Sequence, residues 1–138
     1  MKKLGYIVIL ILLIFSPLSC EDSILSVDCD ECFTDLTNMY SLEIKVSFDE
    51  ENSAVPITIY RGNIDDGVVI SEDTVFSNPY YSIDVEFGHR YSAIARYRHN
   101  GRIIYAVDGR VLKKKYEKSS CDEPCYVIKG DVLDLRLK

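Results

Sequence analysis

Most of the chain after residue 40 alternates apolar and polar residues, and this period of two constrains the fold more than any other feature. The apolar positions of the clearest stretches are Leu42, Ile44, Val46 and Phe48; Val55, Ile57 and Ile59; and Tyr81, Ile83, Val85 and Phe87. Successive side chains of a strand point to opposite faces, so each stretch predicts a strand with one buried face. No stretch carries a helical repeat of useful length, and the sequence predicts an all-β fold.

Turn-forming residues separate these stretches at intervals of about ten residues. Asn100-Gly101 between two apolar runs predicts a hairpin, because this pair fits a two-residue turn. Asp108-Gly109 predicts a second turn, and residues 132–138 alternate as a closing strand.

About seven short strands favour a single antiparallel β-sandwich, because each apolar face needs a second sheet to cover it. A small barrel is the alternative.

The stretch Val55-Pro56-Ile57-Thr58-Ile59-Tyr60 is followed by a Gly-containing turn, a Thr-bearing run and a Tyr-rich run. This order resembles Ig-like or transthyretin-like domains of bacterial surface lipoproteins. The resemblance implies a style of β-sandwich and no activity, because one fold hosts many functions.

The first 19 residues have the organisation of a signal peptide. Lys2 and Lys3 precede an apolar run over residues 4–15, and small residues follow it. About a dozen apolar residues are too few for a membrane-spanning helix, which needs roughly 20. We therefore expect residues 1–19 to be cleaved.

The signal peptide ends in Leu18-Ser19-Cys20, which resembles a lipobox, although Pro17 stands where Leu is commonest. Such relaxed boxes are similar to those of Bacteroidota lipoproteins. The resemblance implies diacylation of Cys20, with palmitate-like chains, and cleavage just before it. Glu21-Asp22 resembles the signal that exports lipoproteins to the outer face of the outer membrane. The alternative is an ordinary signal peptide followed by a structural cysteine.

Cleavage would leave 119 residues, enough for one domain, with an acidic tether and Cys-x-x-Cys loop at 20–38 and a β-sandwich at 39–138. Loss of Lys2 and Lys3 shifts the net charge from −6 to −8. This charge argues against nucleic acid and anionic headgroups as partners. We therefore expect membrane attachment through acyl chains on Cys20. The layout also resembles a group of uncharacterised small Bacteroidota lipoproteins.

Four further cysteines form two clusters, Cys29 with Cys32 and Cys121 with Cys125. An even number in an exported chain favours disulfides, with three connectivities open. We favour bridges between the clusters, because closing a loop of about 90 residues constrains the unfolded chain most. The alternative is tetrahedral zinc on the four thiolates, which the interleaved acidic residues oppose. A redox-active pair is a weaker alternative, because no βαβ setting is visible.

The inventory for catalysis is small, so we expect neither an enzyme nor a cofactor. His89 and His99 are the two histidines, and a triad drawn from Ser92, His89 and Asp84 has no support beyond residue type. The run from Asn63 to Gly67 lacks the spaced acids and final Glu of a calcium loop.

Tyrosine and arginine gather around the expected hairpin. Tyr91, Tyr97 and Tyr105 lie there with Arg96 and Arg98. Exposed tyrosine with arginine is typical of protein-recognition surfaces, so these residues are a candidate binding face. The alternative is that they are cross-strand pairs in a half-solvated sheet.

The leading hypothesis is a lipid-anchored, non-enzymatic β-sandwich that binds an envelope protein or has a structural accessory role. Its expected place is the outer membrane, on the periplasmic or the surface-exposed face. The alternative hypothesis is a thiolate zinc-binding or redox protein that uses the four clustered cysteines.

Overall fold

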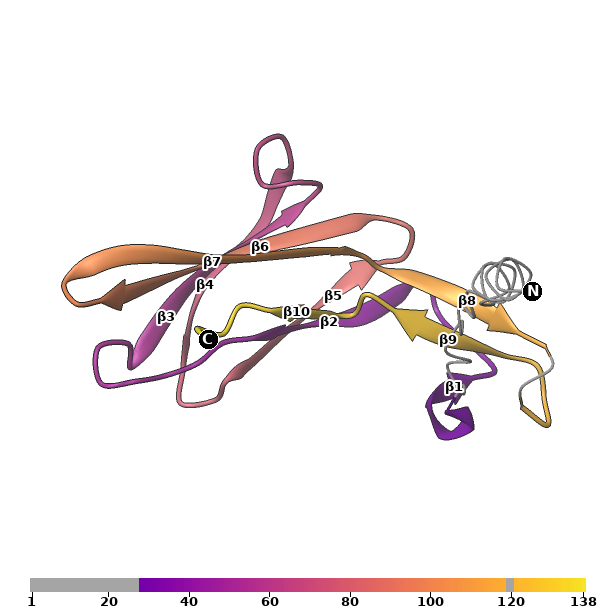
Figure 1. The fold of residues 1–138 in the computed structure, drawn as a ribbon. Coiled ribbons are helices and arrows are strands. Elements are labelled where there is room, and N and C mark those ends of the chain that lie inside the picture. The colour runs from indigo at the N-terminus through magenta and orange to yellow at the C-terminus, as the bar shows by residue number, and fades with distance from the viewer. Residues whose placement is uncertain (1–27, 119–120) are drawn as a thin grey trace, which may run out of the picture.

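The computed structural model describes residues 28–118 and 121–138, and in these residues the chain is all-β, as predicted (Figure 1). The expected signal peptide and Cys20 lie outside the described residues. The elements in chain order are η1 (Cys29–Glu31), β1 (Cys32–Phe33), β2 (Met39–Lys45), β3 (Ala54–Arg61), β4 (Val68–Phe76), β5 (Tyr80–Glu86), β6 (Arg90–His99), β7 (Arg102–Val111), β8 (Lys113–Glu117), β9 (Cys125–Lys129) and β10 (Val132–Asp134). The described part contains no helix long and apolar enough to cross a membrane.

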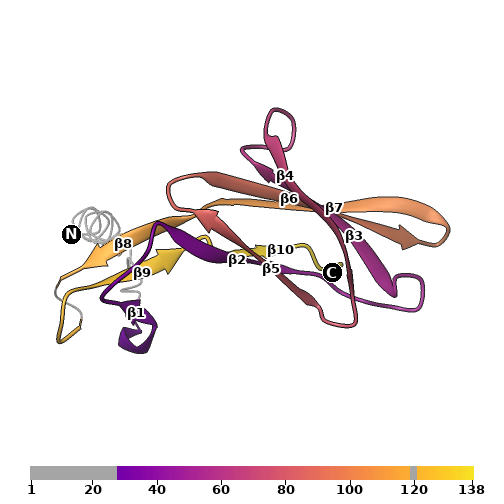
Figure 2. The same cartoon turned by 180° about the vertical axis from the view of Figure 1, so that it is seen from behind.

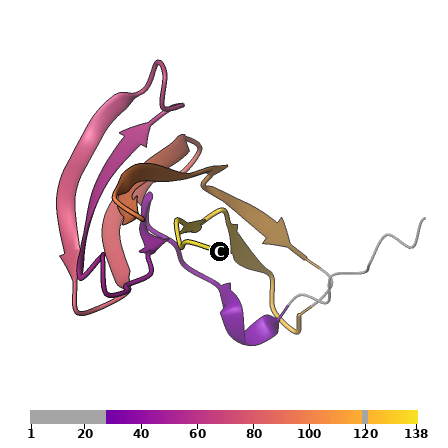
Figure 3. The same cartoon turned by 60° about the vertical axis from the view of Figure 1, so that its left-hand side comes forward.

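The strands form three sheets, two of which face each other as a sandwich. The four-stranded sheet has the order β4-β3-β6-β7 and the facing three-stranded sheet has the order β10-β2-β5 (Figure 2). A smaller end sheet, β1-β9-β8, is set off from the sandwich (Figure 3). The end sheet and the β6–β7 turn lie at opposite ends of the molecule (Figure 1).

The core lies between the two facing sheets and follows the alternation in the sequence. Its members include Leu42 and Ile44 of β2, Val55, Ile57 and Ile59 of β3, Tyr91, Ala93, Ala95 and Tyr97 of β6, and Leu133 of β10. All of them are at most 2% exposed, and burying each large apolar side chain contributes about 1.5–3 kcal/mol relative to exposure. The strands therefore bury the face that their period of two predicted.

The expected β-sandwich is confirmed, and one of its strand pairs is parallel. The described residues form ten strands where about seven were expected, and β10 pairs with β2 in parallel, Leu133 lying opposite Ile44. The reason is that both strands enter the sandwich from the end sheet, β2 after β1 and β10 after β9. The expected closing strand at 132–138 is also shorter, since β10 ends at Asp134.

The Asn-Gly hairpin is confirmed, whereas the turn predicted at Asp108-Gly109 is wrong. Asn100 has φ 52° and Gly101 φ 72°, as a two-residue turn with positive φ at both positions requires. Asp108 and Gly109 lie inside β7, where Gly109 is opposite Ser92. A Cβ on Gly109 would lie 2.5 Å from the Ser92 hydroxyl, so glycine serves close packing there.

Asn52 completes the ladder of the four-stranded sheet beyond the start of β3. Its side chain is 3% exposed; Nδ2 donates to the Arg98 carbonyl at 2.9 Å, and Oδ1 accepts from the Arg98 amide at 2.7 Å. Asn52 Nδ2 also donates to Asp49 at 2.7 Å. One side-chain amide therefore replaces a strand partner for both backbone groups of Arg98.

Replacement Asn52→Leu is expected to lower the free energy of unfolding by about 2–3 kcal/mol, because it removes both partners of the Arg98 backbone in a part-buried place. Chemical denaturation measures the difference. Ser53→Ala, in the exposed neighbour, is the matched control and should change the free energy by less than about 0.5 kcal/mol. Equal effects of the two replacements would contradict this role of Asn52.

Candidate functional site

The outer face of the four-stranded sheet is the surface on which apolar and basic side chains gather. On β7, Ile103 is 57% exposed, Tyr105 63% and Val107 56%. The register places Arg98 opposite Ile103, Arg96 opposite Tyr105 and Ile94 opposite Val107. Directly opposite residues share a face, so the side chains of these three cross-strand pairs lie together on the outer face.

The predicted binding face is wrong for Tyr91 and Tyr97, which the structure places in the core at 2% and 1% exposure. Residues 91 and 97 have the opposite parity to residues 96 and 98, so the two tyrosines point inward and the two arginines outward. Tyr105 joins Arg96 and Arg98 on the outer face because it lies opposite Arg96. The period of two alone could have separated these two groups.

Both buried tyrosines use their hydroxyl groups for structure. Tyr97 donates to the Leu135 carbonyl at 2.9 Å and accepts from the Ser47 amide at 3.2 Å. Tyr91 donates to the Glu86 carbonyl at 2.9 Å, and burial raises the pKa of its phenol above the ordinary value. These groups stabilise the sandwich and are not offered to a partner.

A shallow hollow of about 580 Å³ crosses the outer face beside Tyr105. Thr58 and Ile94 are opposite one another within it, and Glu72 of β4 is opposite Thr58 on the other side. Arg96 and Tyr105 also line it. The hollow therefore has an acidic rim on β4 and a basic and aromatic rim on β6 and β7.

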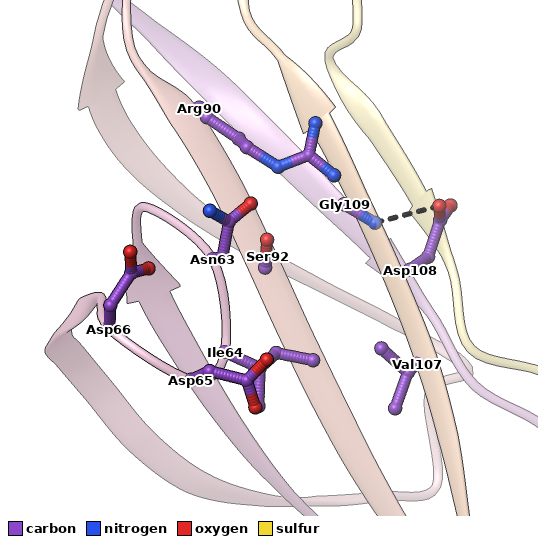
Figure 4. A pocket seen from close by; sticks show the side chains of 9 residues that line it. All are labelled: Asn63, Ile64, Asp65, Asp66, Arg90, Ser92, Val107, Asp108 and Gly109. Carbon is purple, nitrogen blue, oxygen red and sulfur yellow. Dashed lines mark hydrogen bonds between the residues drawn. The ribbon is translucent and has the colours of Figure 1, made fainter.

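A second polar hollow, of about 550 Å³, lies under the loop between β3 and β4 (Figure 4). The loop contributes Asn63, Asp65 and Asp66, and β6 contributes Arg90 and Ser92. Figure 4 shows the two loop carboxylates directed away from each other. The two carboxylates therefore do not converge on one point as metal ligands would.

The residues that could be drawn as a catalytic triad have other partners. The Ser92 hydroxyl donates to the Gly62 carbonyl at 2.8 Å, and Ser92 is 3% exposed. His89 Nε2 lies 3.6 Å from a Glu86 carboxylate oxygen. Within residues 28–118 and 121–138, no hydrogen bond joins Ser92 to His89 or His89 to Asp84. This arrangement gives the Ser92 hydroxyl no general base.

Disulfide bonds were expected and are present, and they join the two cysteine clusters. Cys29 is bonded to Cys121 and Cys32 to Cys125, across 92 and 93 residues of sequence. One bridge connects η1 to Cys121, four residues before β9, and the other connects β1 to Cys125, the first residue of β9. β1 also pairs with β9, through Cys32 and Phe33. The pairing holds the beginning of the described chain against its last third.

The sulfur atoms are also the densest group of metal-ligand atoms in the described part of the chain. Sγ of Cys32, Cys121 and Cys125 lie within 4.8 Å of one another, and no other group of three or more His, Cys, Asp or Glu is this close there. With thiols in place of disulfides, this group would offer the soft ligands that zinc prefers.

Comparisons with protein-family models, with curated proteins and with solved structures give no match for this chain. The interpretation of its surfaces therefore rests on the residues themselves. Ile103 and Val107 are residues of β7 on the outer face that the sequence prediction missed. Their odd numbering, shared with Tyr105, is the signal that could have found them.

Proposed function

We propose that the chain is a lipid-anchored, non-enzymatic β-sandwich that presents the outer face of its four-stranded sheet to a protein partner in the cell envelope. The observation that carries the binding role is the exposed group of Ile103, Tyr105 and Val107 beside Arg96 and Arg98. Aromatic residues with arginine are enriched where proteins bind each other.

The position of the disulfide bonds supports the anchoring part of the proposal. Asp28 precedes the bridged Cys29 and lies eight residues after Cys20. Eight residues span at most about 29 Å, so a lipid on Cys20 would hold the end sheet close to the membrane. A force on the tether would then act on β9 through the disulfide bonds, and not on the short β1 alone.

Replacement Cys20→Ser is expected to move the protein from the membrane fraction to the soluble fraction of the cells that express it. One acyl chain binds a membrane only weakly, whereas two chains together hold a protein firmly. Both chains of the expected diacyl group depend on the Cys20 thiol, so the serine variant should carry neither. Cys29→Ser with Cys121→Ser is the matched control, since it also removes cysteines but should leave the protein on the membrane. Membrane retention of Cys20→Ser would contradict the anchor.

The second candidate function is thiolate zinc binding, which the close approach of the Cys32, Cys121 and Cys125 sulfur atoms favours. The two candidates differ in the state of the thiols. Metal analysis and thiol counting on protein isolated without reductant separate them. Four blocked thiols and no zinc support the disulfide-stapled module, whereas stoichiometric zinc with reactive thiols supports the metal site.

A further inference from the structure

One backbone edge of β7 is open along its first half. In a two-residue hairpin the residues that flank the turn form a hydrogen-bonded pair, here His99 with Arg102. Hydrogen-bonded and non-hydrogen-bonded pairs alternate along an antiparallel ladder. The pairs that Ile103, Tyr105 and Val107 form with β6 are therefore the non-hydrogen-bonded ones. The amide and carbonyl groups of these three residues point away from β6, toward the edge of the sheet.

The same alternation continues to the end of β7, but there the chain covers its own edge. The Gly109 amide donates to the Asp108 side chain at 2.8 Å, and Gly130 packs against the Val111 carbonyl so closely that a Cβ would overlap it. Asp108 also accepts from the Asp134 amide of β10 at 3.0 Å. In the described part of the chain no hydrogen bond outside the β6–β7 ladder reaches the backbone of residues 103, 105 or 107.

This open edge lacks the features that usually prevent edge pairing. Proteins protect edge strands with charged side chains, proline, bulges or a covering loop. Here the three residues with open backbone groups are all apolar and each is more than half exposed. β7 also pairs with β6 in an unbroken register over ten residue pairs.

We infer that the open edge of β7 pairs with β7 of a second copy of this chain, antiparallel and centred on Tyr105. In this register Tyr105 lies opposite Tyr105 of the second copy, and Ile103 lies opposite Val107. All three pairs are formed by residues whose backbone groups point outward, so each can exchange two hydrogen bonds. The edge is thus complementary to itself, as a two-fold dimer interface requires.

The charges at the ends of the stretch fit the same register. Arg102 lies opposite Asp108 of the second copy, on the same face of the joined sheet. Arg102 has no ion-pair partner among the described residues, and Asp108, which lies 3.5 Å from Arg110 Nε of its own chain, would gain a second one. Charge repulsion between the arginines of the outer face should oppose this pairing only weakly. Arg96 and its symmetry mate would be three strands, or about 14 Å, apart, which exceeds the roughly 8–10 Å screening length of physiological salt.

This inference names the partner for the binding role proposed above, and it rests on that role but not on the lipid anchor. Antiparallel pairing places the two end sheets at opposite ends of the dimer, since each β7 runs from the hairpin turn toward its own end sheet (Figure 1). Both tethers could reach one membrane if the dimer lies along it.

The test is sedimentation velocity on the full chain, purified in detergent. The wild type is expected to sediment as a dimer. Tyr105→Lys should weaken self-association at least ten-fold, because it places a charge at the centre of the open edge, between Ile103 and Val107. Phe76→Lys is the matched control, because Phe76 is equally exposed, at 63%, on β4 at the other edge of the same sheet. It should leave self-association within two-fold of the wild type.

Register is tested by oxidative cross-linking of single cysteine variants. Opposite residues of a hydrogen-bonded pair have Cα atoms about 5.5 Å apart, so Tyr105→Cys should form a covalent dimer. Ile103→Cys should not, because residue 103 would lie about 13 Å along the strand from its own symmetry mate. Circular dichroism checks that each variant keeps its β-structure.

A monomeric wild type would overturn the inference, and so would a dimer that Tyr105→Lys leaves intact. Large open-ended assemblies sensitive to Phe76→Lys would also overturn it, because they would indicate β7 pairing with β4 of the next copy. A monomer that still partitions with membranes through Cys20 would contradict only this inference and leave the anchor standing.

Discussion

Loss of both disulfide bonds is expected to lower the free energy of unfolding by about 7 kcal/mol, whereas loss of either bond alone should lower it by only about 2–3 kcal/mol. The two bridges span nearly the same segment, with separations of 92 and 93 residues. Either bridge alone closes this long loop, which contributes about 4–5 kcal/mol in the chain-entropy account. The second bridge then closes only a ring of about nine residues, which contributes much less.

Urea denaturation of three variants measures this coupling: Cys29→Ser with Cys121→Ser, Cys32→Ser with Cys125→Ser, and all four together. Domains of this size have total stabilities of about 5–15 kcal/mol, so the fourfold variant should be unfolded or nearly so at 37 °C. Strictly additive losses, with about 4–5 kcal/mol for each bridge, would show that the bridges do not share one loop.

Replacement Tyr97→Ala should lower the free energy of unfolding by about 3–5 kcal/mol, because Tyr97 is the largest side chain that the described core buries almost completely. The change creates a cavity and also removes the hydroxyl that bonds the Leu135 carbonyl and the Ser47 amide. Thermal and chemical denaturation measure the loss.

Tyr105→Ala is the control for this prediction, since it removes the same side chain from an exposed position on the neighbouring strand. Its effect on the stability of the single chain should be within about 0.5 kcal/mol. Similar effects for Tyr97 and Tyr105 would contradict their assignment to opposite faces of the four-stranded sheet.

The local pattern predicted the strands that have one buried face, and it was weakest for the edge strand β4, which the sequence indicated only as a Thr-bearing run after the Gly-containing turn. β2, β3, β5 and the β6–β7 hairpin follow directly from alternation and from Asn100-Gly101. β4 has only Val75 buried, so its residues carry no alternation that a core would impose. A bulge between Ile59 and Tyr60 shifts its register as well.

The errors at Asp108-Gly109 and at β10 arose because contacts far apart in sequence decide these regions. Gly109 is required by Ser92 on the next strand, and Asp108 holds the amide of Asp134. Nothing in the local sequence distinguishes this Asp-Gly pair from a turn. The parallel pairing of β10 with β2 likewise depends on where the end sheet lies.

For the candidate site, residue type was a weaker guide than position along the strand. Tyrosine and arginine around the hairpin suggested one face, but parity divides them between the core and the surface. The apolar edge formed by Ile103, Tyr105 and Val107 becomes visible only when the hairpin register fixes which backbone groups are open.

Intact mass spectrometry of the protein extracted from membranes, with and without reduction before alkylation, tests the lipid anchor and the disulfide bonds together. We expect a chain that begins at Cys20, carries acyl groups, and gains alkyl groups on Cys29, Cys32, Cys121 and Cys125 only after reduction. A chain without lipid, or four cysteines that alkylate without reduction once metal is chelated, would contradict this expectation.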